Sequence, residues 1–264
     1  MADKRTLCVE VFSACCVAVR DGVLIHRTSK EDKEFHFQNW FSARLDGLHC
    51  AYDKPARNTY PDFRLVEVTE GYEIKGLAYP GREASYDSNS QVPTGHHNGR
   101  DIYYVFGRYP KDAAGDDYPV IDLVVCHGDF LNADHEYVHK NKSIKGFGSY
   151  GDIMIRDRKM YVAPTPFALT SGTTGQQTLI LPTGGQRDDR LVEVGGLVRV
   201  EAEKLVIGYT FDLKNNRIKA ELIDNPGKGT KHEFTAYRLK GAQEKPVTIK
   251  EARIEAPEDD EDAD

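Results

Sequence analysis

The sequence has little of what marks a disulfide-stabilised secreted protein or a disordered chain. Its 264 residues include five cysteines and one tryptophan, and no two cysteines have the C-x-x-C spacing. An odd, irregularly spaced set argues against a disulfide framework, so we expect reduced thiols that pack as small hydrophobic groups. Hydrophobic residues make up 39% and charged residues 29% of the chain, which is typical of a globular protein with a sizeable core.

Long hydrophobic runs are also missing. The apolar stretch near the N-terminus, 7–19, is interrupted by Glu10. It is too short and too charged to cross a bilayer, and its apolar core is too short for a signal peptide. We therefore expect a buried helix or strand at this position, no contact with a membrane, and a cytoplasmic protein.

The chain lacks the excess of basic residues that favours nucleic-acid binding. It has 35 Lys and Arg against 42 Asp and Glu, which gives a net charge of −7. Seven acidic residues in the segment 254–264 account for all of this charge, so residues 1–253 are neutral overall. A run of like charges repels itself and buries nothing, so we expect 251–264 to be a disordered acidic tail.

The hydrophobic pattern predicts helical structure first and strands afterwards. Apolar residues at helical spacing predict a core-facing helix over 33–45 that ends near Asp46-Gly47. A tight turn is predicted at Glu70-Gly71 and a long polar loop over 82–100. Period-two patterns and short apolar runs predict strands at 63–68, 72–79, 102–109, 120–126, 152–162, 177–181, 191–200, 204–213, 217–223 and 232–239.

The most informative residues are Pro61-Asp62 and Glu73-Ile74-Lys75. Alternation along a strand puts Glu73 and Lys75 on one face, and a hairpin would bring Asp62 alongside Glu73. Two carboxylates and the Ile74 carbonyl are hard oxygen ligands of the kind that Mg²⁺ prefers. A lysine beside them could orient or help deprotonate a metal-bound water and stabilise charge on a phosphate. The alternative is a solvated ion pair on the wet face of a strand.

This segment resembles the PD-(D/E)xK nuclease superfamily, and within it the type II restriction endonucleases. Pro61-Asp62, ten intervening residues and Glu73-Ile74-Lys75 match the family motif without gaps. The segment 86–100 and the strand after it are similar to the loop and strand that these enzymes place after the motif. The resemblance covers about residues 55–165 and implies an α/β (α+β) fold, a nuclease core with a mixed central β-sheet flanked by helices.

The same resemblance implies the division of the chain and its chemistry. Residues 1–160 would form the catalytic core, and 161–250 would be a β-rich region that completes the fold or contacts DNA. Asp62, Glu73 and the Ile74 carbonyl would hold Mg²⁺, and Lys75 would activate the water that attacks the phosphodiester and leaves a 5′-phosphate.

The implied substrate is double-stranded DNA, cut at a specific sequence. The implied enzyme is a homodimer, because a two-fold protein matches a palindromic site, and its genetic partner is a cognate DNA methyltransferase. Some family members add an acid from the preceding helix, for which Glu34 is the nearest candidate.

Two polar segments supply candidate DNA contacts. Residue types that can pair with base edges precede the strand 102–109, namely Ser88, Asn89, Ser90, Gln91, His97, Asn98 and Arg100. The stretch 140–159 has six basic residues against two acidic ones. Its candidates for DNA contacts are Lys142, Lys145, Arg156, Arg158 and Lys159. Both segments also fit an ordinary solvated surface.

A zinc-dependent hydrolase is the first alternative. The run His135-Glu136-Tyr137-Val138-His139 has the H-E-x-x-H spacing of zinc metalloproteases, in which both histidines share one face of a helix. Its polar flanks offer no buried helix face, and a third ligand such as Glu193 has no supporting motif. His127 and Asp129 lie nearby and could join such a cluster.

A non-enzymatic, β-rich binding module is the second alternative. In that case Glu73 and Lys75 are surface residues, and the composition is explained equally well.

Overall fold

The computed structural model describes residues 6–27, 33–53, 60–89, 91–112, 115–139, 142–145, 148–157, 160–171, 173–185, 188–242 and 245–250. The predicted acidic tail lies outside these ranges.

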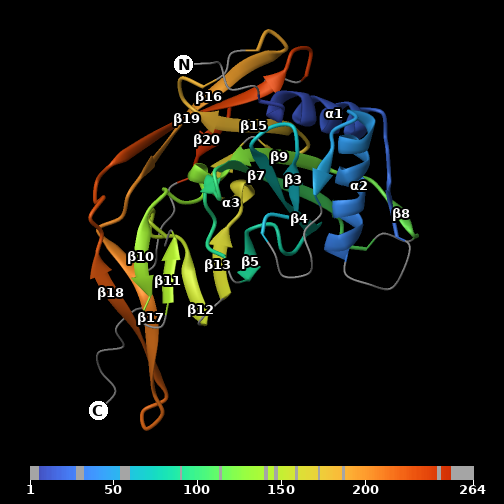
Figure 1. Cartoon of the computed structure of the whole chain (residues 1–264). Coiled ribbons are helices and arrows are strands. Elements are labelled where there is room, and N and C mark those ends of the chain that lie inside the picture. Colours follow the sequence, from blue (N-terminus) through green and yellow to red (C-terminus); the bar gives the residue numbers. More distant parts are fainter. Residues whose placement is uncertain are drawn as a thin grey trace.

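Two helices, α1 (Cys8–Arg20) and α2 (Lys33–Gly47), lie on one face of a large sheet (Figure 1). The N-terminal apolar stretch is a helix, because its buried residues recur every three or four positions. The second helix was predicted correctly, and it buries Phe37, Trp40, Phe41 and Leu45 against the sheet. Among the described helices, none is long and apolar enough to cross a membrane.

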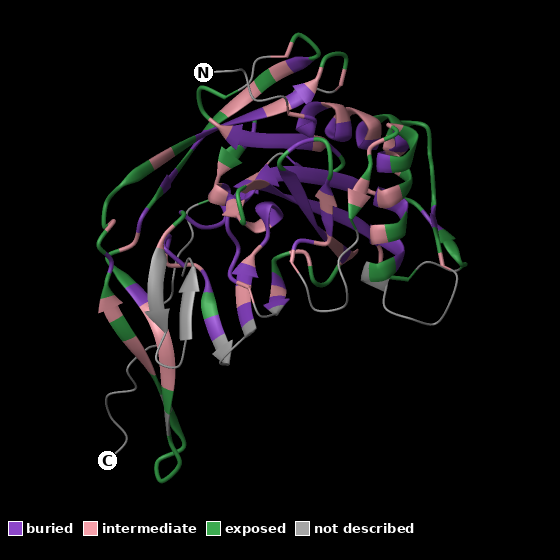
Figure 2. Cartoon of the chain, in the orientation of Figure 1, coloured by how far each residue is buried: buried purple, intermediate pink, exposed green. Residues whose placement is uncertain are grey.

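The large sheet has nine strands in the order β16-β19-β15-β9-β7-β4-β3-β2, with β6 paired to β7. The pairs β4–β7 and β9–β15 are parallel, and the other pairs are antiparallel, so the fold is a mixed-sheet α/β fold. Figure 2 shows that its central strands are buried. The strands are β2 (Tyr52–Asp53), β3 (Phe63–Leu65), β4 (Glu70–Tyr79), β6 (His96–His97), β7 (Arg100–Pro110), β9 (Asp122–His127), β15 (Gln177–Pro182), β16 (Leu191–Val200) and β19 (Lys231–Leu239).

The sheet separates two cores. The face under α1 and α2 contributes Tyr72, Ile74, Tyr103 and Val105, whereas the opposite face contributes Tyr104 and other apolar residues. Because side chains alternate along β4, Glu73 and Lys75 point to the face away from the two helices.

That second face is covered by a smaller sheet and short elements. The smaller sheet has the order β12-β13-β5. The elements on this side are β5 (Ser85–Asn89), β12 (Met154–Asp157), β13 (Met160–Pro164), η1 (Gly128–Phe130) and α3 (Pro166–Leu169). Their apolar residues pack with Tyr104 and Phe106 of β7.

Four two-stranded pairs complete the structure. The hairpin of β17 and β18 projects away from the large sheet, and its tip is exposed (Figures 1 and 2). The pairs are β1 (Ile25–His26) with β8 (Asp117–Tyr118), β10 (Glu136–His139) with β11 (Lys142–Lys145), β14 (Thr170–Ser171) with β20 (Thr248–Ile249), and β17 (Lys204–Asp212) with β18 (Arg217–Asp224).

The turn predicted at Glu70-Gly71 is wrong, since both residues belong to β4 and the chain reverses over 66–69 instead. Gly71 pairs with Arg64. A Cβ atom at this position would lie 2.6 Å from Pro61 Cγ, so the glycine serves a close approach between segments.

Two further predictions of secondary structure are corrected. The segment 82–100 contains β5 and β6, and the predicted strand 152–162 is two antiparallel strands, β12 and β13. The boundary placed at residue 160 falls at the first residue of β13. Strands β15, β16 and β19 lie in the same large sheet as β4 and β7, so the two predicted regions share one sheet.

All five cysteines are free thiols, as predicted. Four of them are buried, and burial raises the pKa of Cys8 and of Cys15 to about 12. These thiols therefore stay protonated and pack as hydrophobic groups.

Candidate active site

Asp62 lies where the pairing between β3 and β4 ends. The two strands pair only through Phe63 with Tyr72 and Arg64 with Gly71. Just before this pairing, Asp62 Oδ2 accepts a 2.8 Å hydrogen bond from the N–H of Ile74. The Asp62 side chain thus takes the place of a strand neighbour at the edge of β4.

The side chain of Glu73 contacts the backbone of Asp62. Its Oε2 atom accepts a 3.3 Å hydrogen bond from the backbone N–H of Asp62. The two carboxylates, which the motif separates by ten intervening residues, are therefore held together by reciprocal backbone contacts.

The backbone of Ile74 adds a third oxygen at this edge. In a β-strand the N–H and C=O of one residue point to the same neighbouring strand. Because the Ile74 N–H points to Asp62, its carbonyl oxygen faces the same side. We name Asp62, Glu73, Lys75 and the Ile74 carbonyl the carboxylate site.

Lys75 completes the carboxylate site. Its Nζ lies 3.0 Å from Glu73 Oε1, and the side chains of Lys75 and Glu73 are only 13% and 11% exposed. A solvated pair on a wet strand face would be mostly exposed, so that alternative is wrong. The binding-module hypothesis loses its premise that these two residues are on the surface.

Tyrosines support the segment that carries Asp62. The Tyr60 hydroxyl lies 2.9 Å from the Tyr104 hydroxyl and 3.4 Å from the carbonyl of Thr94. Burial, and the negative charge of Glu73, raise the pKa of Tyr60 well above its usual value. The hydroxyl of Tyr60 therefore stays protonated and keeps its hydrogen bonds.

The donor set of the carboxylate site fits a divalent cation. The site brings together two carboxylates and the Ile74 carbonyl, and these donors are hard oxygen atoms. This chemistry suits Mg²⁺ better than a softer metal ion.

Several of the predicted DNA contacts make hydrogen bonds within the protein, among them Ser88, Gln91 and Arg100. Ser88 is buried, and its hydroxyl donates to the carbonyl of Gln91 over 2.5 Å. Arg100 Nη1 donates to the carbonyls of Leu65 and Val68 at 2.7 and 3.1 Å, so Arg100 ties the 66–69 turn to β7. Both contacts stabilise the fold.

One of the other predicted contacts, His97, lies beside Tyr60, two residues before Asp62. The ring of His97 packs edge-on against Tyr60, with centroids 5.0 Å apart. Asn98 is exposed in the turn between β6 and β7, and Gln91 begins the segment that leads to Thr94. These three residues belong to the polar segment before the strand 102–109, in which the sequence predicted DNA contacts.

Some of the predicted DNA contacts, and the candidate acid Glu34, have residues or side chains outside the described part of the chain. Ser90, Arg158 and Lys159 lie outside the described residues. The described part covers the backbone, but not the side chain, of Glu34, Asn89, Lys142, Lys145 and Arg156.

The H-E-x-x-H run does not have the geometry of a zinc metalloprotease. Residues 136–139 form strand β10 instead of a helix, and residues four apart in a strand are separated by about 13 Å. His135 Nε2 lies 2.8 Å from Glu201 Oε1, while the predicted third ligand, Glu193, pairs with Tyr237. The helical zinc site is therefore wrong.

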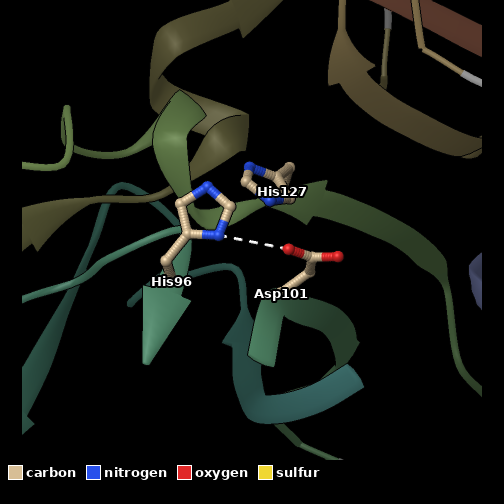
Figure 3. A group of neighbouring side chains, drawn as sticks. All are labelled: His96, Asp101 and His127. Atoms are coloured by element: carbon tan, nitrogen blue, oxygen red, sulfur yellow. Dashed lines mark ion pairs between the residues drawn. The ribbon is translucent and has the colours of Figure 1, made fainter. Parts of the chain in front are cut away.

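A different group of metal-ligating residues was missed at the sequence level. His96, Asp101 and His127 each offer a ligand atom, and these atoms lie within 4.8 Å of one another (Figure 3). We name these three residues the histidine cluster. The hydrogen bond to Asp101 raises the pKa of His96, against the effect of its partial burial.

The fold alone creates the histidine cluster. His96 and Asp101 pair across the β6–β7 hairpin, and His127 ends β9, opposite Tyr103 of β7. The only local signal was the run His127-Gly128-Asp129.

No protein-family model matches this chain, and no matching curated protein was found. The assignment of an activity therefore depends on the geometry of its sites.

Proposed function

We propose that this protein is a Mg²⁺-dependent endonuclease of the PD-(D/E)xK type that cuts double-stranded DNA at a specific sequence, as type II restriction enzymes do. The observation that carries the proposal is the convergence of Asp62, Glu73 and Lys75 at the edge of β4, beside the Ile74 carbonyl.

The oxygen atoms of Asp62, Glu73 and Ile74 would hold Mg²⁺. When bound, this ion supplies Lewis-acid polarisation of the phosphate and offsets its negative charge. The backbone N–H groups of Ile74 and Asp62 orient the two carboxylates before any ligand arrives, which reduces the cost of assembling the site.

Lys75 would act on the water and on the phosphate. Its ammonium is held by Glu73, where it can orient the attacking water and stabilise the charge that develops on the phosphoryl oxygens. In the proposed hydrolysis the water gives up one proton to the solvent as its oxygen bonds to phosphorus, and the bond to the 3′ oxygen breaks. The 3′ oxygen takes up a proton and the 5′-phosphate remains.

Recognition of the substrate would come from neighbouring segments. Gln91, His97 and Asn98 belong to the segment 91–98, whose His97 contacts Tyr60. These residues would contact bases, and basic residues of 142–159 would contact phosphates. A homodimer would match a palindromic site, and a cognate methyltransferase would protect host DNA.

The proposal is tested by digestion of phage DNA and plasmid DNA with the purified full-length chain, with Mg²⁺ or with chelator. We expect discrete fragments in Mg²⁺ alone, with ends that a ligase can rejoin because they carry 5′-phosphates. Binding of DNA without any cleavage in Mg²⁺ would favour the binding module instead.

A further inference from the structure

We propose that the histidine cluster, His96, Asp101 and His127, is a second metal site that binds a transition-metal ion of the Zn²⁺ class. It is separate from the carboxylate site, because its ligands come from β6, the start of β7 and the end of β9.

The spacing of the ligand atoms suits one ion. His96 Nδ1 lies 3.1 Å from Asp101 Oδ1, and the three ligand atoms lie within 4.8 Å of one another. Ligands at the usual Zn–N and Zn–O distances are about 3.3 Å apart around a tetrahedral ion. Small rotations of the side chains would therefore close the cluster around a metal.

The carboxylate of Asp129 lies next to both histidines of the cluster. Its Oδ2 atom lies 3.4 Å from Nδ1 of His127 and 3.8 Å from Nε2 of His96. A carboxylate in this position typically orients metal-bound imidazoles and raises their basicity. Within the part of the chain that the structure describes, Asp129 Oδ1 is buried and has no hydrogen-bond partner. A buried carboxylate oxygen in that state favours a cation nearby.

The donor types separate the two sites. Two imidazoles with one carboxylate are a donor set for Zn²⁺ and related ions, whereas Mg²⁺ prefers oxygen ligands alone. His127 is 7% exposed at its side chain and His96 is 45% exposed, so the cluster is anchored on one side and open to solvent on the other.

His96 of the histidine cluster belongs to the segment that supports Tyr60. The carbonyl of Thr94 accepts from the Tyr60 hydroxyl, and the ring of His97 packs on the Tyr60 ring. A metal bound by His96 would therefore restrain Thr94 and His97, the two residues of this segment that contact Tyr60. Tyr60 precedes Asp62 by two residues.

Zinc binding to the chelator-treated full-length chain tests this inference without any measurement of DNA cleavage. We expect about one zinc ion per chain, and a visible d–d absorption band when Co²⁺ replaces zinc. His127→Ala should abolish stoichiometric binding. Asp129→Asn should weaken the affinity by about 10- to 100-fold, as for other residues that orient metal ligands. His96→Gln, at a half-exposed side chain, provides a variant with little effect on the core.

Two matched controls locate the site. His26→Ala, at an exposed histidine, should leave the stoichiometry of zinc binding unchanged. Glu73→Gln in the carboxylate site should also leave it unchanged. The inference is overturned if the wild-type chain retains no zinc, or if His96→Gln and a folded His127→Ala bind zinc as tightly as wild type. Loss of zinc in His135→Ala, with both of these variants unaffected, would place the metal elsewhere.

Discussion

The buried ion pair between Arg108 and Asp122 provides a quantitative test of the structure. Arg108 Nε donates to Asp122 Oδ1 over 2.7 Å, Nη2 donates to Oδ2, and the N–H of Gly175 donates to Oδ2 over 3.0 Å. The side chains are 4% and 0% exposed. The guanidinium also lies over the rings of Tyr79 and Phe167.

We expect Asp122→Ala to be strongly destabilising. It leaves the Arg108 charge buried without its partner, which costs about 3–5 kcal/mol. For a chain of about this size each kcal/mol lowers the Tm by about 2–4 °C, so the expected decrease is about 6–20 °C. The free energy of unfolding is itself only about 5–15 kcal/mol, so the variant would be marginally stable.

Two variants separate loss of the pair from loss of a side chain. Arg108→Met combined with Asp122→Leu removes both charges and should recover most of the lost stability. The exposed Lys204–Asp224 pair supplies the matched control, because Asp224→Ala should leave the Tm almost unchanged. Thermal and urea unfolding measure these differences. If Asp122→Ala lowered the free energy of unfolding by less than about 1 kcal/mol, the claim that this variant leaves the Arg108 charge buried and unpaired would be refuted.

Two other predictions concern the fold around the carboxylate site. Burial raises the pKa of Glu70, so wild type should lose stability as the pH rises from the ordinary glutamate pKa through this raised value. Glu70→Gln removes that loss, so the Tm of the variant relative to that of wild type should increase from pH 5 to pH 8. An equal Tm difference at the two pH values would contradict this prediction. Gly71→Ala should cost about 1–3 kcal/mol and reduce DNA cleavage, because its Cβ would displace Pro61. If Gly71→Ala unfolded in urea and cleaved DNA as wild type does, the close approach of Gly71 to Pro61 would be contradicted.

The sequence predicted the regular elements well where one local pattern decides them. The helix α2 and the strands β4, β7 and β9 follow from spacing of apolar residues. The turn near Gly71 failed because glycine there serves close packing against Pro61, a contact between segments that no local rule detects.

The same distinction applies to the sites. Asp62 and Glu73 were placed together because a hairpin joins them over a short stretch. The histidine cluster depends on the pairing of β7 with β9, and Arg100 has the residue type of a base reader but donates to backbone carbonyls. Residue type alone does not reveal the partner that the fold supplies.

Single-turnover cleavage by Lys75→Met tests the proposed nuclease activity most directly. DNA cleavage in Mg²⁺ and DNA binding in Ca²⁺ would be measured for wild type, for Lys75→Met and for the exposed-lysine control Lys219→Met. We predict that Lys75→Met binds DNA with wild-type affinity but cleaves it at least about 100-fold more slowly. The control Lys219→Met should bind and cleave DNA as wild type does. Equal cleavage by Lys75→Met and wild type would contradict the proposed role of the carboxylate site.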